Sequence, residues 1–280
     1  MKILGLSGKK QSGKNTSVNY LFGLELTCGT YNFKGQVIDV ESFRIDEKGK
    51  LLVPVEHEGV IKESMLDLEN PTDTLREFLA LNIAPFLKCY SFADKLKQMC
   101  IHIFGLEYSQ CYGSDDDKNT FTLYSWKAMP KELQRKFWGK ADSSPDRNIT
   151  AREFLQLIGT QVFRWIHGDV WVESCIRQIT IEQPELAIIP DVRFPNEVYG
   201  LQKAGGKVIR LTRHVKEDSH ESETALDDFT DWDAVIDNQN MTITEQNNEV
   251  FRVLKEWDYL PYPINTKLEE ILNDCLLPTQ

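Results

Sequence analysis

Short apolar runs alternate with longer amphipathic stretches along most of the chain. Runs typical of buried strands lie at 3–6, 88–92, 186–189, 207–212 and 234–236. Stretches with apolar residues at helical spacing lie at 14–22, 72–81, 93–104, 150–163, 171–181, 196–204 and 244–257. Because these strands and helices alternate, we expect an α/β fold with a doubly wound, mainly parallel sheet.

Two stretches interrupt the alternation. Residues 34–75 contain strand-like segments at 36–45 and 51–55 around the turn signal Glu47-Lys48-Gly49, which predicts an inserted hairpin. Residues 107–148 are polar and aromatic, which is typical of a lid-like insertion. We therefore expect one domain over 1–258 with these two insertions, and a C-terminal extension at 259–280 that packs on the domain around Leu268 and Ile271.

The first apolar run leads into a glycine-rich loop. Gly8, Gly13 and Lys14 have the G-x-x-x-x-G-K spacing of a phosphate-binding loop. Glycines let successive N–H groups turn inward, the helix N-terminus adds positive charge, and the lysine reaches the outer phosphates. Asn15 stands where this motif usually has Ser or Thr, and Thr16 follows it. The sequence thus identifies the phosphate-binding residues more clearly than it identifies the protein ligand of a magnesium ion.

Two further strand ends carry charged residues. Asp191 and Arg193 follow the run at 186–189, where an acidic residue typically organises magnesium opposite the phosphate loop and an arginine can clamp a phosphate. A turn that caps the next helix is the alternative for Asp191. Lys97 lies early in the helix that follows 88–92. It is either a residue that faces a ligand or an ordinary surface lysine.

Composition limits the classes of function. The chain of 280 residues is 41% hydrophobic and 27% charged, with a net charge of −11, so it lacks the basic field that holds nucleic acid. The six cysteines show no metal-binding spacing, and no apolar run reaches the length of a membrane span. We expect free thiols, no membrane partner and a cytoplasmic location.

Several blocks together resemble the phage-type deoxynucleoside monophosphate kinases, a branch of the phosphate-loop (P-loop) kinases. They are L-S-G-K-K-Q-S-G-K-N-T at 6–16, Y-S-F-A-D-K-L-K at 90–97, Y-G-S-D-D-D-K-N-T at 112–120, T-A-R-E-F-L-Q-L-I-G-T at 150–160, D-V-W-V at 169–172 and I-I-P-D-V-R-F-P-N-E at 188–197. The resemblance covers most of the chain, but not the hairpin at 36–56 or the tail after 258.

The resemblance implies an ATP donor with Mg²⁺ and a deoxynucleoside monophosphate acceptor. Residues implied for ATP are Ser12, Gly13, Lys14, Asn15, Thr16 and Ser17, with Thr16 and Asp191 for the metal. Residues implied for the acceptor are Lys10, Lys97, Lys118, Arg152, Thr160, Gln161 and Trp171. Residues expected to act in phosphoryl transfer are Lys14, Lys10, Arg152, Asp191 and Arg193. The resemblance also allows two chains to pair as a homodimer, and places the protein in a host cytoplasm if a phage encodes it.

Two other classes stay open from the sequence. A P-loop kinase of a non-nucleotide metabolite is the main alternative. The other is a nucleotide-binding module without catalytic turnover, or a nucleic-acid motor. The net negative charge disfavours the motor, and the positive residues near the loop disfavour a module that only binds nucleotide. The sequence does not rank the four bases.

Overall fold

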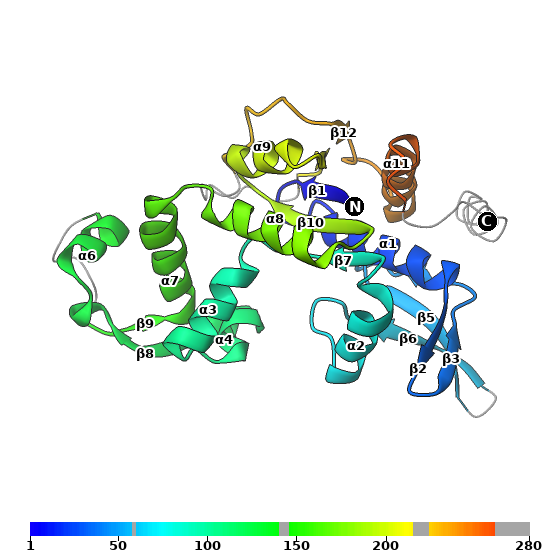
Figure 1. Ribbon diagram of the computed structural model, residues 1–280, viewed down its shortest axis with the longest axis horizontal. Helices are drawn as coiled ribbons and strands as arrows, with labels where there is room; N and C mark the ends of the chain where they lie inside the picture. Colours follow the sequence, from blue (N-terminus) through cyan, green and yellow to red (C-terminus); the bar gives the residue numbers. More distant parts are fainter. Residues whose placement is uncertain (58–59, 140–145, 215–223, 261–280) are drawn as a thin grey trace. The chain divides into compact units, whose positions relative to one another are not determined.

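The computed structural model describes residues 1–57, 60–139, 146–214 and 224–260 (Figure 1). The chain forms two compact units, and each is described by itself. The first unit consists of Met1–Tyr90 with Ile179–Gln280, and the second of Ser91–Gln178. The predicted helix around Leu268 and Ile271 lies outside the described residues.

A five-stranded parallel sheet forms the centre of the first unit. Its strands are β1 (Lys2–Ser7), β7 (Leu87–Cys89), β10 (Leu186–Val192), β11 (Lys207–Leu211) and β12 (Ala234–Ile236). They lie in the order β12-β11-β1-β10-β7, and every neighbouring pair is parallel. The strands read as continuous apolar runs because helices cover both faces of the sheet. The predicted fold class is confirmed.

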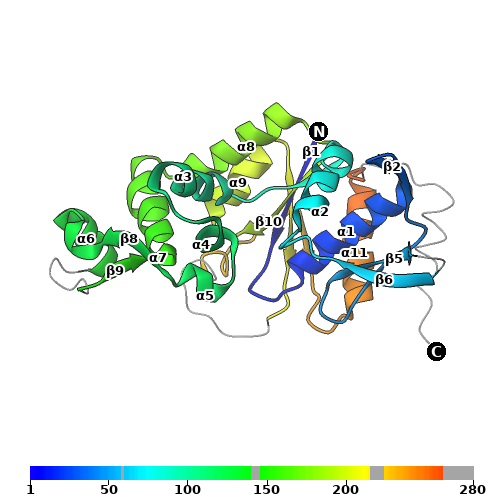
Figure 2. The same cartoon turned by 90° about the horizontal axis from the view of Figure 1, so that it is seen from below.

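Helices lie on both faces of this sheet. Figure 2 shows α9 (Pro195–Lys203) on one side and α1 (Lys14–Cys28) with α11 (Ile243–Glu256) on the other. Every residue of α1 from Ser17 to Thr27 is buried, so the helix has no polar face to set its period. For that reason the sequence pattern placed the end of α1 too early, near residue 22.

The first insertion forms two small sheets rather than the single predicted hairpin. β2 (Thr30–Phe33) pairs with β3 (Gln36–Asp39), while β4 (Arg44–Ile45), β5 (Leu51–His57) and β6 (Val60–Leu66) form a separate antiparallel sheet. Between the two sheets, Phe43 turns inward against Tyr20 and Gly23 of α1, which ends the strand predicted over 36–45. The turn at Gly49, with φ +78°, is confirmed.

A short helical segment connects the insertion to β7. Thr72 caps α2 (Asp73–Phe78), with its hydroxyl accepting a hydrogen bond from the Leu75 N–H. A π-helical turn, η1 (Leu79–Ile83), continues α2 toward the sheet.

The second unit is mainly helical. Its helices are α3 (Asp94–Phe104), α4 (Tyr108–Tyr112), α5 (Asp115–Lys118), α6 (Lys131–Trp138), α7 (Ala151–Gln156) and most of α8 (Val170–Glu182). It also contains the antiparallel pair β8 (Phe121–Ser125) and β9 (Asn148–Thr150), a 3₁₀ turn η2 (Trp126–Ala128) and a π-helical segment η3 (Leu157–Arg164). A capping box formed by Thr150 and Glu153 begins α7. The predicted helix over 150–163 therefore changes from α to π geometry at Leu157.

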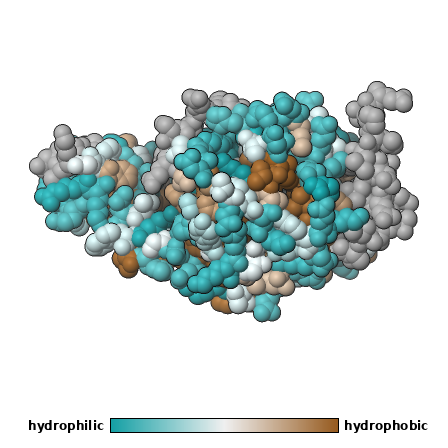
Figure 3. Space-filling model, turned by 90° about the horizontal axis from the view of Figure 1, so that it is seen from above, coloured by the Kyte–Doolittle hydropathy of each residue, from teal (hydrophilic) through white to brown (hydrophobic). Residues whose placement is uncertain are grey.

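The exposed surface fits the composition. The face in Figure 3 is mostly hydrophilic, with a few compact hydrophobic groups. In the part of the chain that the structure describes, no helix combines the length and the hydropathy of a membrane span. The cysteines at 28, 89, 100, 111 and 175 are free thiols, as predicted.

Candidate active site

The glycine-rich loop joins β1 to α1 at the carboxyl edge of the sheet. Gly13 adopts φ +98° at the N-terminus of α1, in the left-handed region that a side chain disfavours. A Cβ atom at Gly13 would lie 2.3 Å from Oε1 of Gln246, so space as well as conformation requires glycine. The predicted phosphate cradle thus has the expected strand–loop–helix setting.

Lys14 lies over its own loop. Its Nζ donates hydrogen bonds to the carbonyl oxygens of Gly8, at 2.7 Å, and Lys9, at 2.8 Å. Ser12 Oγ is 3.4 Å from the same ammonium group. The cation is therefore held at the centre of the cradle, where the outer phosphates of a bound nucleotide would meet it.

Two polar residues far along the chain form hydrogen bonds with the loop. Gln246 of α11, 1% exposed, donates to the carbonyl oxygen of Gly13 at 3.0 Å and to Ser17 Oγ at 2.9 Å. Asn238 donates to the carbonyl oxygen of Ser12 at 2.8 Å and to Gln246 Oε1 at 2.6 Å. The sequence offered no signal for these two supports, because both lie in polar stretches far from the motif.

The residues after Lys14 differ in accessibility. Asn15 is exposed, whereas the buried Ser17 donates to Asn247 Oδ1 at 3.3 Å, and its N–H donates to the Gly13 carbonyl oxygen within α1. Thr16 lies against the insertion, since a Cβ on Gly49 would be 2.2 Å from Thr16 Oγ1. The hydroxyl groups of Thr16 and Ser17 are thus both in contact with protein.

Asp191 lies on the strand next to the loop. β10 is the neighbour of β1, and Ser7 pairs with Val192, so Asp191 comes one residue before the point level with the start of the loop. The strand is longer than predicted and includes Asp191. Glu197 accepts the N–H groups of Arg193 and Phe194 at 2.8 and 3.1 Å, so it supplies the cap contacts considered for Asp191.

The donor atoms near the loop fit a magnesium ion carried by a nucleotide. Asp191, Asn15 and Thr16 offer only oxygen ligands, which Mg²⁺ prefers. Over the described ranges, no group of three acidic, histidine or cysteine side chains could form a metal cage. Mg²⁺ bound with a nucleotide commonly takes one or two protein ligands and completes its shell with phosphates and water.

Lys10, in the loop, and Arg193, directly after β10, belong to the first unit, whereas the remaining predicted residues lie in the second. They are Lys97 on α3, Lys118 at the end of α5, Arg152 on α7, Thr160 and Gln161 on η3, and Trp171 on α8. Arg152 donates to Asn119 Oδ1 at 3.1 Å and to Asp115 Oδ1 at 2.8 Å, with its side chain 43% exposed. The acidic run Asp115–Asp117 belongs to α5, and Asp115 holds Arg152.

Lys97 and Trp171 have aromatic or backbone partners. Lys97 Nζ lies 4.5 Å from the centre of the Tyr112 ring. Burial raises the pKa of the neighbouring Asp94, and Lys97 acts against this shift. Trp171 is 7% exposed and its Nε1 donates to the carbonyl oxygen of Gly159 at 3.0 Å, directly before the exposed Thr160.

A family model described as deoxynucleotide monophosphate kinase matches residues 95–249, which is more than half of the chain. The chain belongs to the deoxynucleotide monophosphate kinase family. The match includes every predicted acceptor residue except Lys10, and also Asp191, Arg193, Asn238 and Gln246.

Two viral proteins are similar to this kinase. A protein of Acanthamoeba polyphaga mimivirus, named provisionally as a deoxynucleotide monophosphate kinase, is 28% identical over 174 residues, covering 57% of this chain and 79% of the relative. The deoxynucleoside-5'-monophosphate kinase of Escherichia phage T5 is 38% identical over 72 residues, covering 25% of this chain and 26% of the relative. This family membership favours a deoxynucleotide substrate over a non-nucleotide metabolite.

Proposed function

We propose that this kinase transfers the terminal phosphoryl group of ATP to the phosphate of a deoxynucleoside monophosphate. The observation that carries the proposal is the loop between β1 and α1, with Lys14 at its centre and Asp191 on the adjacent strand. The family supplies the acceptor class. An acceptor phosphate is already ionised, so the reaction needs charge neutralisation and alignment rather than a strong general base.

The donor half of the proposal rests on the loop. N–H groups of Ser12 to Thr16 and the Lys14 ammonium group would bind the donor phosphates. Asp191, with Asn15 or Thr16, would hold a magnesium ion or its waters; the metal supplies charge neutralisation between the phosphates when bound. Ser17 supports the loop through Gln246 and Asn247.

The acceptor half of the proposal rests on the second unit and on two cations of the first. Lys97, Lys118, Arg152, Thr160 and Gln161 would bind the monophosphate, and Trp171 would hold the backbone beside Thr160. Lys10 and Arg193 would add positive charge next to the transferring group. Arg152 would exchange its single hydrogen bond to Asp115 for a phosphate, which carries more charge and can accept two parallel hydrogen bonds.

A substrate screen tests the proposal. ADP release is followed with ATP and each of dAMP, dCMP, dGMP and dTMP, and with the matching ribonucleotides, and the products are separated by chromatography. We expect a deoxynucleoside diphosphate and stoichiometric ADP. ADP release without any monophosphate, and stimulated by DNA, would contradict the proposal and favour a motor.

A further inference from the structure

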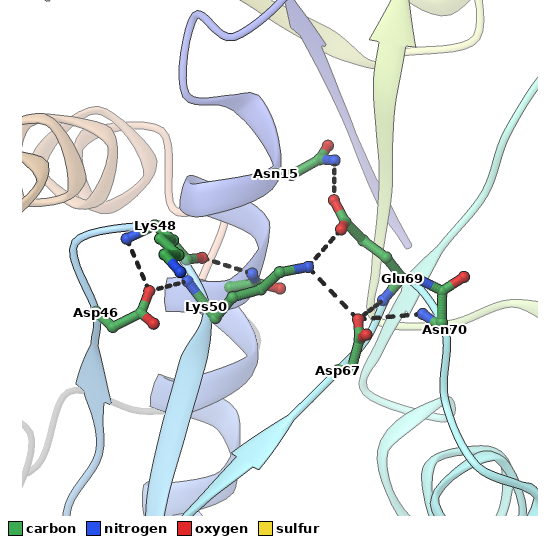
Figure 4. A network of polar contacts seen from close by, with 9 residues as sticks. Asn15, Asp46, Lys48, Lys50, Asp67, Glu69 and Asn70 are labelled. Carbon is green, nitrogen blue, oxygen red and sulfur yellow. Dashed lines mark hydrogen bonds and ion pairs between the residues drawn. The ribbon is translucent and has the colours of Figure 1, made fainter. Parts of the chain in front are cut away.

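The three-stranded sheet of the insertion contacts α1 directly beside the phosphate loop (Figure 4). The carbonyl oxygen of Gly49, in the turn between β4 and β5, accepts a hydrogen bond from Asn19 Nδ2 at 2.7 Å. Asn19 is 4% exposed, so this contact is shielded from water. The insertion is therefore anchored on the first two turns of the helix that begins at Lys14.

A second contact reaches the loop itself. Glu69, in the segment after β6, accepts a hydrogen bond from Asn15 Nδ2 at 2.5 Å. Asn15 follows the loop lysine directly and is exposed. It occupies the position where the phosphate-loop motif has Ser or Thr, whose hydroxyl oxygen binds Mg²⁺.

The chemistry of this contact fixes which atom of the amide faces Glu69. An ionised carboxylate only accepts hydrogen bonds, so the amide nitrogen must point to Glu69 and not the amide oxygen. Asn15 Oδ1 then lies on the side of the amide away from Glu69 (Figure 4). An amide oxygen is a suitable Mg²⁺ ligand, whereas an amide nitrogen is not.

Glu69 is itself held in place. Its second oxygen accepts from Lys50 Nζ at 2.5 Å, and Lys50 also lies 3.5 Å from Asp67 Oδ1. Asp67 in turn accepts the N–H groups of Glu69 and Asn70 at 3.1 and 3.2 Å. Partial burial acts to lower the pKa of Lys50, but the hydrogen bond to Glu69 and the charges of both carboxylates outweigh it, so the pKa of Lys50 is raised. Lys50 thus stays charged and holds the carboxylate.

We propose that Glu69 is a positioning residue that turns the Asn15 amide so that Oδ1 replaces the usual Ser or Thr hydroxyl as a ligand of the donor-bound Mg²⁺. This inference rests on the proposed function, because it takes Mg²⁺–ATP as the ligand of the loop. It gives the insertion a part in the donor site: the insertion supplies the orientation that Asn15 lacks by itself. Loss of such second-layer partners commonly weakens metal binding about 10- to 100-fold.

The test compares four proteins: the wild type, Glu69→Ala, Asn15→Thr, and the double variant. ATP binding is measured by calorimetry without acceptor, once with Mg²⁺ and once with EDTA. We expect Glu69→Ala to weaken ATP binding about tenfold or more with Mg²⁺ and to leave binding in EDTA unchanged. In the Asn15→Thr background the hydroxyl needs no orientation by a carboxylate, so Glu69→Ala should have no effect on either measurement.

Two controls separate positioning from damage to the insertion. Arg44→Ala removes an exposed ion pair with Glu63 in the same sheet, at 2.6 Å, and should leave ATP binding unchanged. Glu69→Gln keeps an oxygen that can accept from Asn15 and should restore part of the Mg²⁺-dependent affinity. Equal weakening with and without Mg²⁺, or the same loss in the Asn15→Thr background, would overturn the inference.

Failure of this inference differs from failure of the proposed function. If the wild type binds ATP and phosphorylates deoxynucleotides but Glu69→Ala shows no Mg²⁺-specific loss, only the role of Glu69 is wrong. If the wild type does not bind ATP at all, both the proposed function and the role of Glu69 are wrong.

Discussion

At the scale of single residues, Lys14 shows how the loop is stabilised before it meets a ligand. Its ammonium group donates hydrogen bonds to the carbonyl oxygens of Gly8 and Lys9 and so links the two residues. A donor phosphate provides a stronger partner, because its negatively charged oxygens attract the ammonium group more strongly than neutral carbonyl oxygens do. We expect the same cation to support the loop conformation and to stabilise the transferring group.

Replacing this lysine should remove most of the activity. We expect Lys14→Ala to lower kcat/KM with ATP and a deoxynucleoside monophosphate by about 10²- to 10³-fold, the range for loss of one preorganised charge. Coupled ADP release measures the effect, and Lys34→Ala is a matched control, because Lys34 pairs with Glu77 on the surface. Near-normal rates for Lys14→Ala would mean that the loop is not the donor site.

A buried carboxyl group in α1 should make stability depend on pH. Burial raises the pKa of Glu25 from its ordinary 4.5 to about 7, although the Tyr31 hydroxyl, which donates to Oε1 at 3.2 Å, acts in the opposite direction. No described residue donates a hydrogen bond to the other oxygen, Oε2. The folded protein then binds more protons than the unfolded chain between these two values, so the free energy of unfolding falls as pH rises from about 4.5 to about 7.

Glu25→Gln should remove this dependence. The amide stays neutral, so we expect the variant to match the wild type near pH 4.5 and to be more stable at pH 8.5, by on the order of 3 kcal/mol. Urea unfolding at both pH values measures the difference. Parallel changes of the two proteins with pH would show that the pKa of Glu25 is the same in the folded and unfolded chains.

The sequence identified residues whose chemistry belongs to a local motif. Gly13, Lys14 and Asp191 were predicted because a loop spacing or a strand end gave them a role. Gln246 and Glu69 were not predicted, because each is a polar residue in a polar stretch whose partner is distant in the sequence. Nothing in the local pattern separates them from the many solvated glutamines and glutamates of the chain.

At the scale of elements, α11 acts as a support for the phosphate loop. Its Gln246 contacts both Gly13 and Ser17, while its outer face carries the exposed ion pairs of Arg252 with Glu249 and Glu256. One face of the helix thus contacts the loop, and another carries solvent-exposed ion pairs. This division provides a variant and a control on one element.

We expect Gln246→Ala to raise the dissociation constant for ATP about tenfold and to lower stability by about 1–3 kcal/mol, because it leaves buried polar groups of the loop without a partner. Arg252→Ala on the same helix should change the free energy of unfolding by less than about 1 kcal/mol and leave ATP binding unchanged. Calorimetric titration with ATP and urea unfolding measure these effects. Similar ATP affinities for the two variants would show that α11 does not support the loop.

Elements were predicted best where one physical signal dominated. The capping residues Thr72 and Thr150 and the glycine turn at Gly105, with φ +68°, marked helix ends correctly. Predictions were weaker where tertiary contacts decide. The inward turn of Phe43 divides one expected strand into two, and the π geometry from Leu157 onward has no marker in an apolar pattern that also fits an α-helix.

At the scale of the whole molecule, the residues proposed for the two substrates belong mainly to different units of the chain. The donor loop lies in the first unit, and Lys97, Lys118, Arg152, Thr160 and Gln161 lie in the second. A substitution in one unit should therefore change the kinetic constants for one substrate and leave those for the other unchanged. The kinetic constants for ATP and for the monophosphate report on the two units independently.

Arg152 provides the sharpest case. We expect Arg152→Ala to raise KM for the monophosphate at least about tenfold and to leave the dissociation constant for ATP unchanged, because a bidentate charged contact is lost on one substrate only. Arg177→Ala, which removes an exposed pair with Glu173 in the same unit, is the matched control. A rise in the ATP dissociation constant with no change in KM for the monophosphate would assign Arg152 to the donor instead.

The sheet order also bears on how the protein is made. β1 is synthesised long before its partners in the sheet, β10 and β11, and the loop that follows β1 is supported by Gln246, 233 residues after Gly13. During translation, β1 and the loop after it therefore gain these neighbours only after most of the chain has been made. Such distant pairing slows folding and leaves apolar surface exposed in the meantime. The phosphate loop is thus among the last parts to gain its contacts, so a nascent or truncated chain that lacks α11 should bind ATP more weakly than the full chain.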